Sequence, residues 1–515
     1  MNMLIRKNLV LIITLVVIAF MLGVAAQGMD RQDFVITLLR GLAVGSITYL
    51  VASGFSLIFG LLDVLNLAHG TLFMIGAYIG WTVIVRPDTI MDLLTPLALI
   101  LSGFALGDLY PHLSSRIRLG FRMKRFHPWA LGLVSLLVLG FILPRYPIAI
   151  WNVENYSQSP VTFSFMASQG TRLPVQPATF TEISPAVALI GLLLASMFGA
   201  FGLSLFGKDA QRTVRISWKS FIGFAALLVV ALVGFAYNDS LPNALTALHS
   251  NWLFLIAVIV AMASGAGLGG LMEATLIRPL YSRPIYQLML TLGLSAIGIE
   301  MVRAVWGRPE FVTPKPDFFN GTGGACPATN FADWWANHCS TILLWEGRVR
   351  VYNEIFIPIV GLVVLISIWV LLQRTRLGMI IRAGVQDREM VEALGINVRR
   401  VFTMVFALGV GLAALGGVLA APSTGLSNFM GESLFLNALI ALAIGGLTNY
   451  PGAALGSVLV GLIQQFIIKY GQIGIPVPFT EIVFKPSPPL VPASTVLLMV
   501  IILLILPNGL LGKKE

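Results

Sequence analysis

Apolar stretches of about 20 residues recur along the whole length of this 515-residue chain. A helix of that length crosses the hydrocarbon core of a bilayer, and it satisfies its own backbone N–H and C=O groups. Only 11% of the residues are charged, whereas soluble domains average about 25%. The fold class that we predict is therefore an all-α polytopic membrane protein.

We predict about 14 transmembrane helices from these stretches. They cover residues 8–27, 34–60, 67–85, 93–111, 129–147, 185–206, 218–237, 252–275, 286–306, 354–373, 401–424, 433–450, 452–470 and 494–511. Most of the 33 basic residues fall in alternate loops, and this bias places those loops and the C-terminus in the cytoplasm. The same distribution explains the net charge of +10 by contact with membrane lipid and disfavours nucleic acid as a partner.

Residues 1–33 leave two alternatives open. Arg6-Lys7, an apolar core and Val24-Ala25-Ala26 fit an N-terminal anchor helix, and they also fit a cleavable signal peptide. Cleavage after Ala26 leaves every later span unchanged, so the topology does not decide between them.

The two cysteines, Cys326 and Cys339, both fall in the predicted external loop 307–353. An oxidising compartment favours a disulfide between them, as a structural staple, over two unpaired thiols.

Signals for catalysis or metal binding are weak, and we predict that the chain is not an enzyme. The five histidines are scattered without the spacing of metal ligands. Gly202-Leu-Ser-Leu-Phe-Gly207-Lys208 imitates a phosphate-binding loop, but Asp209 follows where Ser or Thr is needed. The main acidic residues within spans, Glu273 and Glu300, lie towards span ends where we expect water to reach them. The alternative class is a secondary carrier or channel that works without ATPase subunits. A proton- or sodium-coupled carrier usually places acidic residues near the membrane midplane.

Two polar breaks interrupt the apolar pattern, one in each half of the chain. The first contains Asn66 and His69, and the second is Thr448-Asn449-Tyr450-Pro451-Gly452. Paired interruptions of this kind are a sequence indicator of a transport site. The residues that we expect along a translocation path are Asn66, His69, Asn437, Thr448 and Asn449. The alternative is that Asn and Gly only turn tight connections between helices.

The predicted cytoplasmic segment 374–400 contains a short helix. Asp387 is suited to cap its N-terminus, Glu389 to its first turn and Gly395 to the left-handed position after its end. Met390 and Leu394 then lie one turn apart. The residues alone fit equally a helix that docks in a groove on a cytoplasmic partner and an ordinary solvated connector.

Motifs along the chain resemble those of branched-chain amino acid ABC-transporter permeases, the membrane subunits of high-affinity importers. The resemblance covers about residues 34–86 and 252–515. It rests on Gly41-Leu-Ala-Val-Gly45-Ser46, Gly54-Phe-Ser-Leu-Ile-Phe-Gly60, Asn66-Leu-Ala-His69-Gly70, Arg278-Pro279-Leu280, Arg376-Leu-Gly378, Glu392-Ala-Leu-Gly395-Ile-Asn397, Gly445-Gly446, Pro451-Gly452-Ala453 and Pro507-Asn-Gly509-Leu-Leu-Gly512.

The resemblance implies a permease subunit of an ATP-driven importer in the bacterial cytoplasmic (inner) membrane. Its partners would be a second homologous permease subunit, two cytoplasmic ATPase subunits and a periplasmic or extracellular solute-binding protein. No cofactor is expected in this chain, because the partner subunits hydrolyse the ATP. The segment 387–397 becomes the coupling helix. Its expected contact residues are Asp387, Arg388, Glu389, Glu392, Ala393, Gly395 and Asn397.

The chain departs from the family pattern at three places, which leaves the solute open between branched-chain or similar small amino acids and urea or amides. Asn449-Tyr450 stands where the family often has a serine, and Gln464-Gln465 stands where a glutamate is frequent. The third departure is an inserted four-helix membrane segment at 91–250, between a first core part (34–90) and the remaining core (251–515). We expect it to form a peripheral layer; the alternative is that its loop 148–184 seats the solute-binding protein.

Overall fold

The structure of the chain is a computed structural model. It describes residues 16, 23 and 27–512, except 117–120, 149–160, 163–164, 167–168, 170–177, 207–217, 308–309, 323, 325, 346, 448 and 477–482. The described part is almost wholly α-helical. Its two small antiparallel sheets pair β1 (Thr341–Leu344) with β2 (Gly347–Arg350), and β3 (Ile475–Pro476) with β4 (Val483–Phe484). The chain is an all-α polytopic membrane protein, as its composition predicts.

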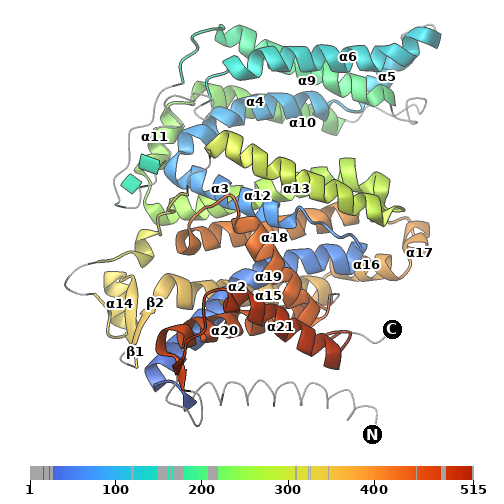
Figure 1. Ribbon diagram of the computed structural model, residues 1–515. Helices are drawn as coiled ribbons and strands as arrows, with labels where there is room; N and C mark the ends of the chain where they lie inside the picture. The colour runs from blue at the N-terminus through green and yellow to red at the C-terminus, as the bar shows by residue number, and fades with distance from the viewer. Residues whose placement is uncertain are drawn as a thin grey trace. The chain divides into compact units, whose positions relative to one another are not determined.

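The chain folds into two compact units, of residues 1–81 with 250–515 and of residues 82–249. We call them the core unit and the inserted unit (Figure 1). The second name follows the expectation from the sequence, and the insertion itself stays a prediction. The helices of the core unit are α2 (Arg31–Leu62), α12 (Ser250–Met272), α13 (Pro284–Trp306), α14 (Phe331–Asn337), α15 (Ile357–Arg374), α16 (Arg376–Gln386), α17 (Arg388–Ala393), α18 (Val398–Thr424), α19 (Met430–Gly445), α20 (Tyr450–Ile473) and α21 (Leu490–Ile505). Those of the inserted unit are α4 (Pro87–Ala105), α5 (Leu109–Arg116), α6 (Phe121–Ile142), α9 (Pro185–Phe206), α10 (Trp218–Ala236) and α11 (Ser240–Ala247). Helix α3 (His69–Val85) begins in the core unit and ends in the inserted unit.

Nine of the described helices are long and apolar enough to cross a membrane, and the bent pair α10–α11 makes a tenth candidate. Three shorter apolar helices, α3, α19 and α21, add to these. The predicted span 8–27 lies almost wholly outside the described residues. Each of the other predicted spans overlaps a helix, but the count of fourteen stays a prediction. The division of the chain at residues 90 and 250 also stays a prediction.

Helices α2 and α18 form the centre of the core unit. In the most apolar stretch of α2, 78% is buried inside the protein, and in that of α18 the buried share is 83%. They approach closely because glycines face each other: a Cβ on Gly54 would lie 2.1 Å from the carbonyl oxygen of Gly409. Small residues let helix backbones meet in this way where lipid removes the hydrophobic drive for association.

Helix α20 also packs closely against α2 through glycines. A Cβ on Gly461 would lie 2.3 Å from the carbonyl oxygen of Gly41, and one on Gly45 would lie 2.9 Å from that of Ser457. The Gly41-x3-Gly45 spacing in the sequence is therefore a helix-packing motif.

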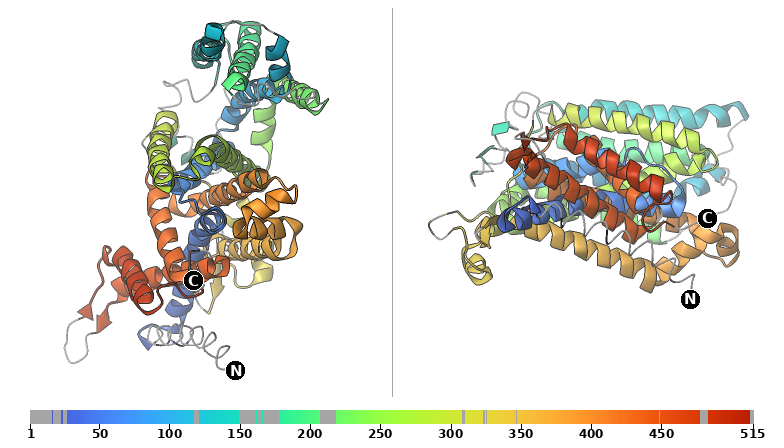
Figure 2. Two further views of the ribbon diagram at one scale, coloured as in Figure 1. Left: turned by 90° about the vertical axis from the view of Figure 1, so that its right-hand side faces the viewer. Right: turned by 60° about the horizontal axis from the view of Figure 1, so that its bottom comes forward.

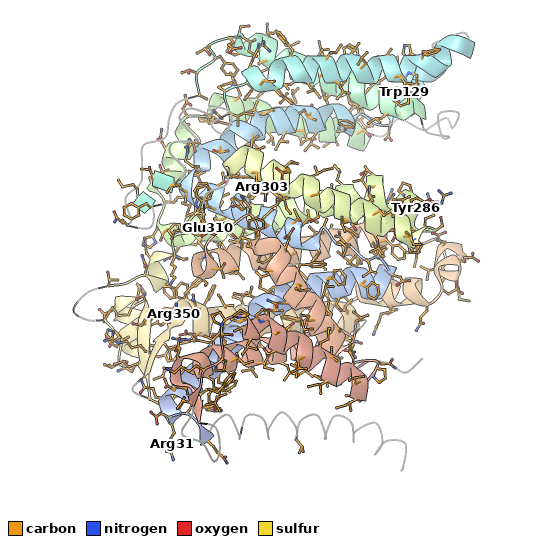
Figure 3. All side chains as sticks on the ribbon, viewed as in Figure 1. Arg31, Trp129, Tyr286, Arg303, Glu310 and Arg350 are labelled. Carbon is orange, nitrogen blue, oxygen red and sulfur yellow. A yellow bond between two sulfur atoms is a disulfide. The ribbon has the colours of Figure 1, made fainter. Side chains whose placement is uncertain are left out.

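The core unit has two distinct ends, joined by α15. Helix α14 and strands β1 and β2 lie at one end, and α16 and α17 lie at the other (Figures 1 and 2). Figure 3 places Arg31, Glu310 and Arg350 at the α14 end and Tyr286 near the α17 end. The helices between them therefore run from one end of the unit to the other.

Around α14, β1 and β2 lies a small folded region of the core unit, which we call the α14-end domain. A disulfide joins Cys326 to Cys339, whose Cα atoms are 5.5 Å apart. The Asn330 side chain accepts a hydrogen bond from the backbone N–H of Asp333 and caps α14. The ring of Phe318 lies 5.0 Å from that of Trp334, between centroids, and packs edge-on. Desolvation, followed by the nearby positive charge of Arg350, lowers the pKa of Lys315 in this domain.

Polar side chains inside the inserted unit bond to backbone oxygens. Ser135 donates to the carbonyl oxygen of Ala195 at 2.7 Å, and Ser196 donates to that of Leu99 at 3.1 Å. Arg86 and Asp88, which flank Pro87, form a buried ion pair at 2.8 Å. Most of loop 148–184, the alternative docking segment for a binding protein, lies outside the described residues.

The α2–α18 contact predicts opposite effects for two glycine substitutions. Gly54→Ala should destabilise the protein by about 1–3 kcal/mol, because the new methyl group overlaps a backbone oxygen that moves only with its helix. The matched control is Gly267→Ala on α12, where nothing lies within 4 Å of the added Cβ. This change should leave stability unchanged or raise it, since alanine favours helix. Thermal unfolding midpoints in detergent measure both, and equal midpoints would contradict the packing argument.

Candidate coupling and translocation sites

A sharp turn joins α15 to α16. The Thr375 hydroxyl donates to the carbonyl oxygen of Leu371 at 2.6 Å and accepts from the backbone N–H of Gly378 at 3.1 Å. A Cβ on Gly378 would lie 2.3 Å from that same carbonyl oxygen of Leu371. The Arg376-Leu-Gly378 motif therefore marks a turn that only glycine fits.

Asp387 caps the N-terminus of α17, and Asn397 caps that of the next helix, α18. The Asp387 carboxylate accepts from the backbone N–H of Met390 at 2.9 Å, and the Asn397 side chain accepts from that of Arg400 at 3.2 Å at the start of α18. Gly395 has φ of +82°, the left-handed conformation that follows many helix ends. The short helix and its caps occur where the sequence predicted them.

Helix α17 has one buried side and one exposed side. Val391 is buried against Val398 and Phe402 of α18. Met390 and Leu394 are 64% and 75% exposed. Of the remaining predicted contact residues, Glu389, Glu392 and Ala393 are exposed, and the Arg388 side chain lies outside the described residues. The exposed side is therefore an apolar pair with acidic neighbours, at one end of the core unit.

A buried charged cluster lies beside this segment, and we call it the inner cluster: Glu273, Arg278, Tyr281 and Thr403. The Glu273 carboxylate is fully buried. It accepts from the Arg278 guanidinium at 3.1 and 2.7 Å, from the Tyr281 hydroxyl at 2.7 Å and from the Thr403 hydroxyl at 2.7 Å. Arg278 also donates to Thr403 at 2.7 Å.

The expectation that water reaches Glu273 is therefore wrong, whereas the Glu300 side chain is 68% exposed. The reason is local backbone geometry. Residues Glu273–Ile277 form a π-helical turn, in which residues five apart face each other. Glu273 and Arg278 show that spacing, but it is not the i,i+4 spacing that signals an ion pair on an α-helix.

A second buried carboxylate lies at the α14 end of the core unit. Glu354, which is 2% exposed, also belongs to a π-helical turn (Val351–Phe356). It accepts from the Arg40 Nε at 3.0 Å and from the backbone N–H of Arg350. This pair links α2 to the start of α15, and sequence spacing gave no signal for it because its partners are 314 residues apart.

The first polar break is buried beside α2. Asn66 accepts from the backbone N–H of Ala68 at 3.1 Å, and His69 Nε2 lies 3.1 Å from the carbonyl oxygen of Val51. Both side chains have no exposed surface. Asn66 Nδ2 and His69 Nδ1 have no hydrogen-bond partner in the described part of the chain. An unsatisfied buried polar atom costs about 1–3 kcal/mol, so these two atoms require an explanation.

The second break is held by the C-terminal motif. Asn449 accepts from the backbone N–H of Gly452 at 3.1 Å, which caps α20, and donates to the carbonyl oxygen of Leu511 at 2.7 Å. The backbone N–H of Leu510 donates to Ile444 at 2.8 Å. The Gly445-Gly446, Pro451-Gly452-Ala453 and Pro507–Gly512 motifs therefore meet in one place. For Asn449 these bonds favour the alternative role of turning a tight connection.

The structure describes one of the two remaining predicted path residues, Asn437. Asn437 on α19 is half-buried and accepts from the Gln464 amide of α20 at 3.1 Å. Thr448 lies outside the described residues. Both breaks contact the same part of α2, since Ser56 donates to the carbonyl oxygen of Leu447 at 3.4 Å and Val51 bonds to His69. Within the described ranges, no three His, Cys, Asp or Glu side chains gather to hold a metal ion.

Comparison with known proteins gives a consistent result. A family described as "Branched-chain amino acid transport system / permease component" matches residues 37–207 and 212–506. The high-affinity branched-chain amino acid transport system permease protein LivH of Escherichia coli is 23% identical over 331 residues, 64% of this chain and 92% of LivH. The corresponding protein BraD of Pseudomonas aeruginosa is 25% identical over 336 residues, 65% of this chain and 94% of BraD.

A more distant relative has another solute in its name. The fructose import permease protein FruF of Bifidobacterium longum is 25% identical over 252 residues, which cover 47% of this chain and 62% of FruF. No solved structure matches the chain.

The bonds of Asn449 predict a graded loss of stability. Asn449→Ser keeps an oxygen that can cap α20 but loses the donor to Leu511, and Asn449→Ala loses both. We expect Ser to cost about 0.5–1.5 kcal/mol and Ala about 1 kcal/mol more. The thermal unfolding midpoint in detergent should therefore fall in the order Asn, Ser, Ala. An alanine variant as stable as the unchanged protein would contradict the role of Asn449 as a cap.

Proposed function

The chain belongs to the family of branched-chain amino acid transport permease components, and from this membership we propose that it is the membrane subunit of an ATP-driven importer. In this proposal it pairs with a second homologous permease subunit, two ATPase subunits bind its cytoplasmic side, and a solute-binding protein delivers the solute from outside. ATP-driven closure of the ATPases moves α17, and the permease pair opens towards the opposite side by alternating access.

The observation that carries the proposal is the form of α17. It is a capped helix whose Val391 is buried in the protein, while Met390 and Leu394 are exposed at one end of the core unit. Exposed apolar side chains on a rigid helix are typical of a protein-docking surface. A solvated connector has no need of them.

The charge and the disulfide support one orientation in the membrane. The segment around α16 and α17 carries the largest group of basic loop residues: Arg374, Arg376, Arg382, Arg388, Arg399 and Arg400. Basic residues concentrate in cytoplasmic loops, and disulfides persist in oxidising compartments. We therefore assign the α17 end to the cytoplasm, and the α14 end with Cys326–Cys339 to the outside, in a bacterial inner membrane.

Two of the buried polar atoms that have no partner among the described residues support a path beside the first break. Asn66 Nδ2 and His69 Nδ1 are buried next to the centre of α2. Polar groups at membrane depth without partners usually mark a substrate or ion pathway. We propose that they contact the solute or water when the permease opens. Asn437 and Thr448 remain path residues in this proposal, and Asn449 holds the second break in place.

We propose branched-chain or similar small amino acids as the solute, because LivH and BraD match over about two-thirds of the chain. Uptake of radiolabelled leucine by proteoliposomes that contain the full transporter and its binding protein tests this choice. Fructose and urea serve as competing probes, and uptake of either one without leucine would overturn it.

A charge on α17 should detach the ATPase subunits. Leu394→Asp places a carboxylate on the docking surface, so we expect at least a tenfold loss of ATPase co-purification, since hot-spot changes of about 2 kcal/mol or more dominate interfaces. Leu394→Met keeps the surface apolar and should have little effect. Trp345→Asp, at a residue 73% exposed in the α14-end domain, is the control at the other end. Equal co-purification with Leu394→Asp would contradict the docking role.

The path assignment predicts that Asn66→Ser separates transport from stability. Serine can still accept from the backbone N–H of Ala68, but it lacks the unpartnered Nδ2 group. We expect an unfolding midpoint that is unchanged or higher, because a buried group without a partner is removed, and leucine uptake reduced about 5-fold or more, as for loss of one solute hydrogen bond of about 1 kcal/mol. Unchanged uptake in an intact assembly would remove Asn66 from the path.

A further inference from the structure

We propose that the inner cluster is the joint that carries a displacement of α17 to the helix pair α12–α18. Glu273, Arg278, Tyr281 and Thr403 are then positioning residues for transport, which act on the path through helices. The inference rests on the proposed docking role of α17 and adds the connection between that surface and the membrane helices.

The first link joins α17 to Tyr281. Val391 of α17 packs with Val398 and Phe402 of α18 in one buried group, and Tyr281 packs against it. The ring of Tyr281 meets that of Phe402 edge-on, with centroids 6.2 Å apart. Close-packed side chains transmit displacement because they have no free volume to absorb it.

The second link is electrostatic and directional. The Tyr281 hydroxyl donates to one oxygen of the Glu273 carboxylate, and the Thr403 hydroxyl donates to the other, each at 2.7 Å. Arg278 spans both oxygens, so the carboxylate has donors on every side. Bidentate, charge-assisted bonds fix orientation as well as distance. The end of α12 and the first turns of α18 are therefore held as one body.

The third link lies within the membrane-spanning part. A Cβ on Gly265 would lie 2.7 Å from the Ala414 Cβ, and one on Gly269 would lie 2.7 Å from the Val410 Cβ. Helices α12 and α18 are thus in close contact beyond the inner cluster as well, at Gly265 and Gly269 of α12. Helix α18 in turn meets α2 at Gly409 and Gly54, and α2 carries Val51, the partner of His69. A displacement that enters at α17 reaches the first break through packed elements.

Stability alone does not explain a buried charge at this position. Well-packed apolar residues commonly stabilise a protein as well as a buried ion pair does, because desolvation offsets the attraction. What the carboxylate adds is a fixed geometry between two segments that are far apart in the sequence, residues 273–281 after α12 and the start of α18. That property keeps α12 and the start of α18 together when α17 is displaced.

The test compares two buried carboxylates in the fully assembled transporter. Glu273→Gln keeps the shape of the side chain and removes its charge. Glu354→Gln is the matched control, because Glu354 is also buried, lies in a π-helical turn and pairs with arginine, but at the α14 end. Leucine uptake and ATP hydrolysis are measured in the same proteoliposomes. We expect Glu273→Gln to lower the solute moved per ATP about 2- to 30-fold, with ATPase co-purification retained, and Glu354→Gln to leave this ratio unchanged.

Tyr281→Phe is the second variant, because it removes one hydrogen bond to the carboxylate and keeps the packed ring. It should lower the same ratio and carries the test if Glu273→Gln does not assemble. An unchanged ratio in the assembled variants, or an equal fall with Glu354→Gln, would overturn the inference. Leu394→Asp separates this failure from failure of the proposed function. If that variant detaches the ATPase while the Glu273 and Tyr281 variants stay coupled, the docking role stands and the joint does not.

Discussion

Polar groups at membrane depth must find partners inside the protein, because a bilayer interior offers no water. The structure meets this requirement at most of its irregular points. Asn449 caps α20 and bonds to Leu511, and Glu273 receives hydrogen bonds from three different side chains. The rule also shows where function is to be sought. Asn66 and His69 each retain a buried, unpartnered nitrogen among the described residues, so the fold alone does not account for them.

Features of the chain that depend on local sequence could be predicted. Helix α9 covers residues 185–206 in both the prediction and the structure, because a long, uncharged and mostly apolar run leaves no alternative. Both ends of α17 could be predicted, because Asp387 bonds to the backbone three residues away and Gly395 takes the left-handed conformation after the helix. Helix α4, however, begins at Pro87 and not at residue 93. In the sequence, the charged residue Asp88 indicates a loop at this point. In the structure it is buried within the helix, because it pairs with Arg86.

Features that depend on distant partners could not be predicted. Thr403 lies 130 residues from Glu273 along the chain, so no spacing rule connects them. The π-helical turn adds a further obstacle, because it makes residues five apart into neighbours. The same limit applied to Asn449. Its side chain bonds to Leu511, 62 residues away, and the sequence alone could not separate a path residue from a structural cap.

The bonds at the two ends of the core unit differ in which helices they join. At the α14 end, the π-helical turn before α15 bonds to α2 through Arg40 and Glu354. It also bonds to α18, because Ser423 donates to Asn353 at 2.8 Å and Tyr352 donates to the carbonyl oxygen of Leu419 at 3.0 Å. At the α17 end, the inner cluster joins α12 to α18.

Helix α2 meets this end of α18 through different contacts, since Leu62 packs in the apolar group of Phe402. Apolar and glycine contacts have no preferred direction, so they allow sliding that a bidentate ion pair resists. In the proposed coupling, a push on α17 therefore moves α12 and α18 together relative to α2, with the α14 end as the fixed side. Helix α2 also contacts both polar breaks, so motion along this contact changes their surroundings directly.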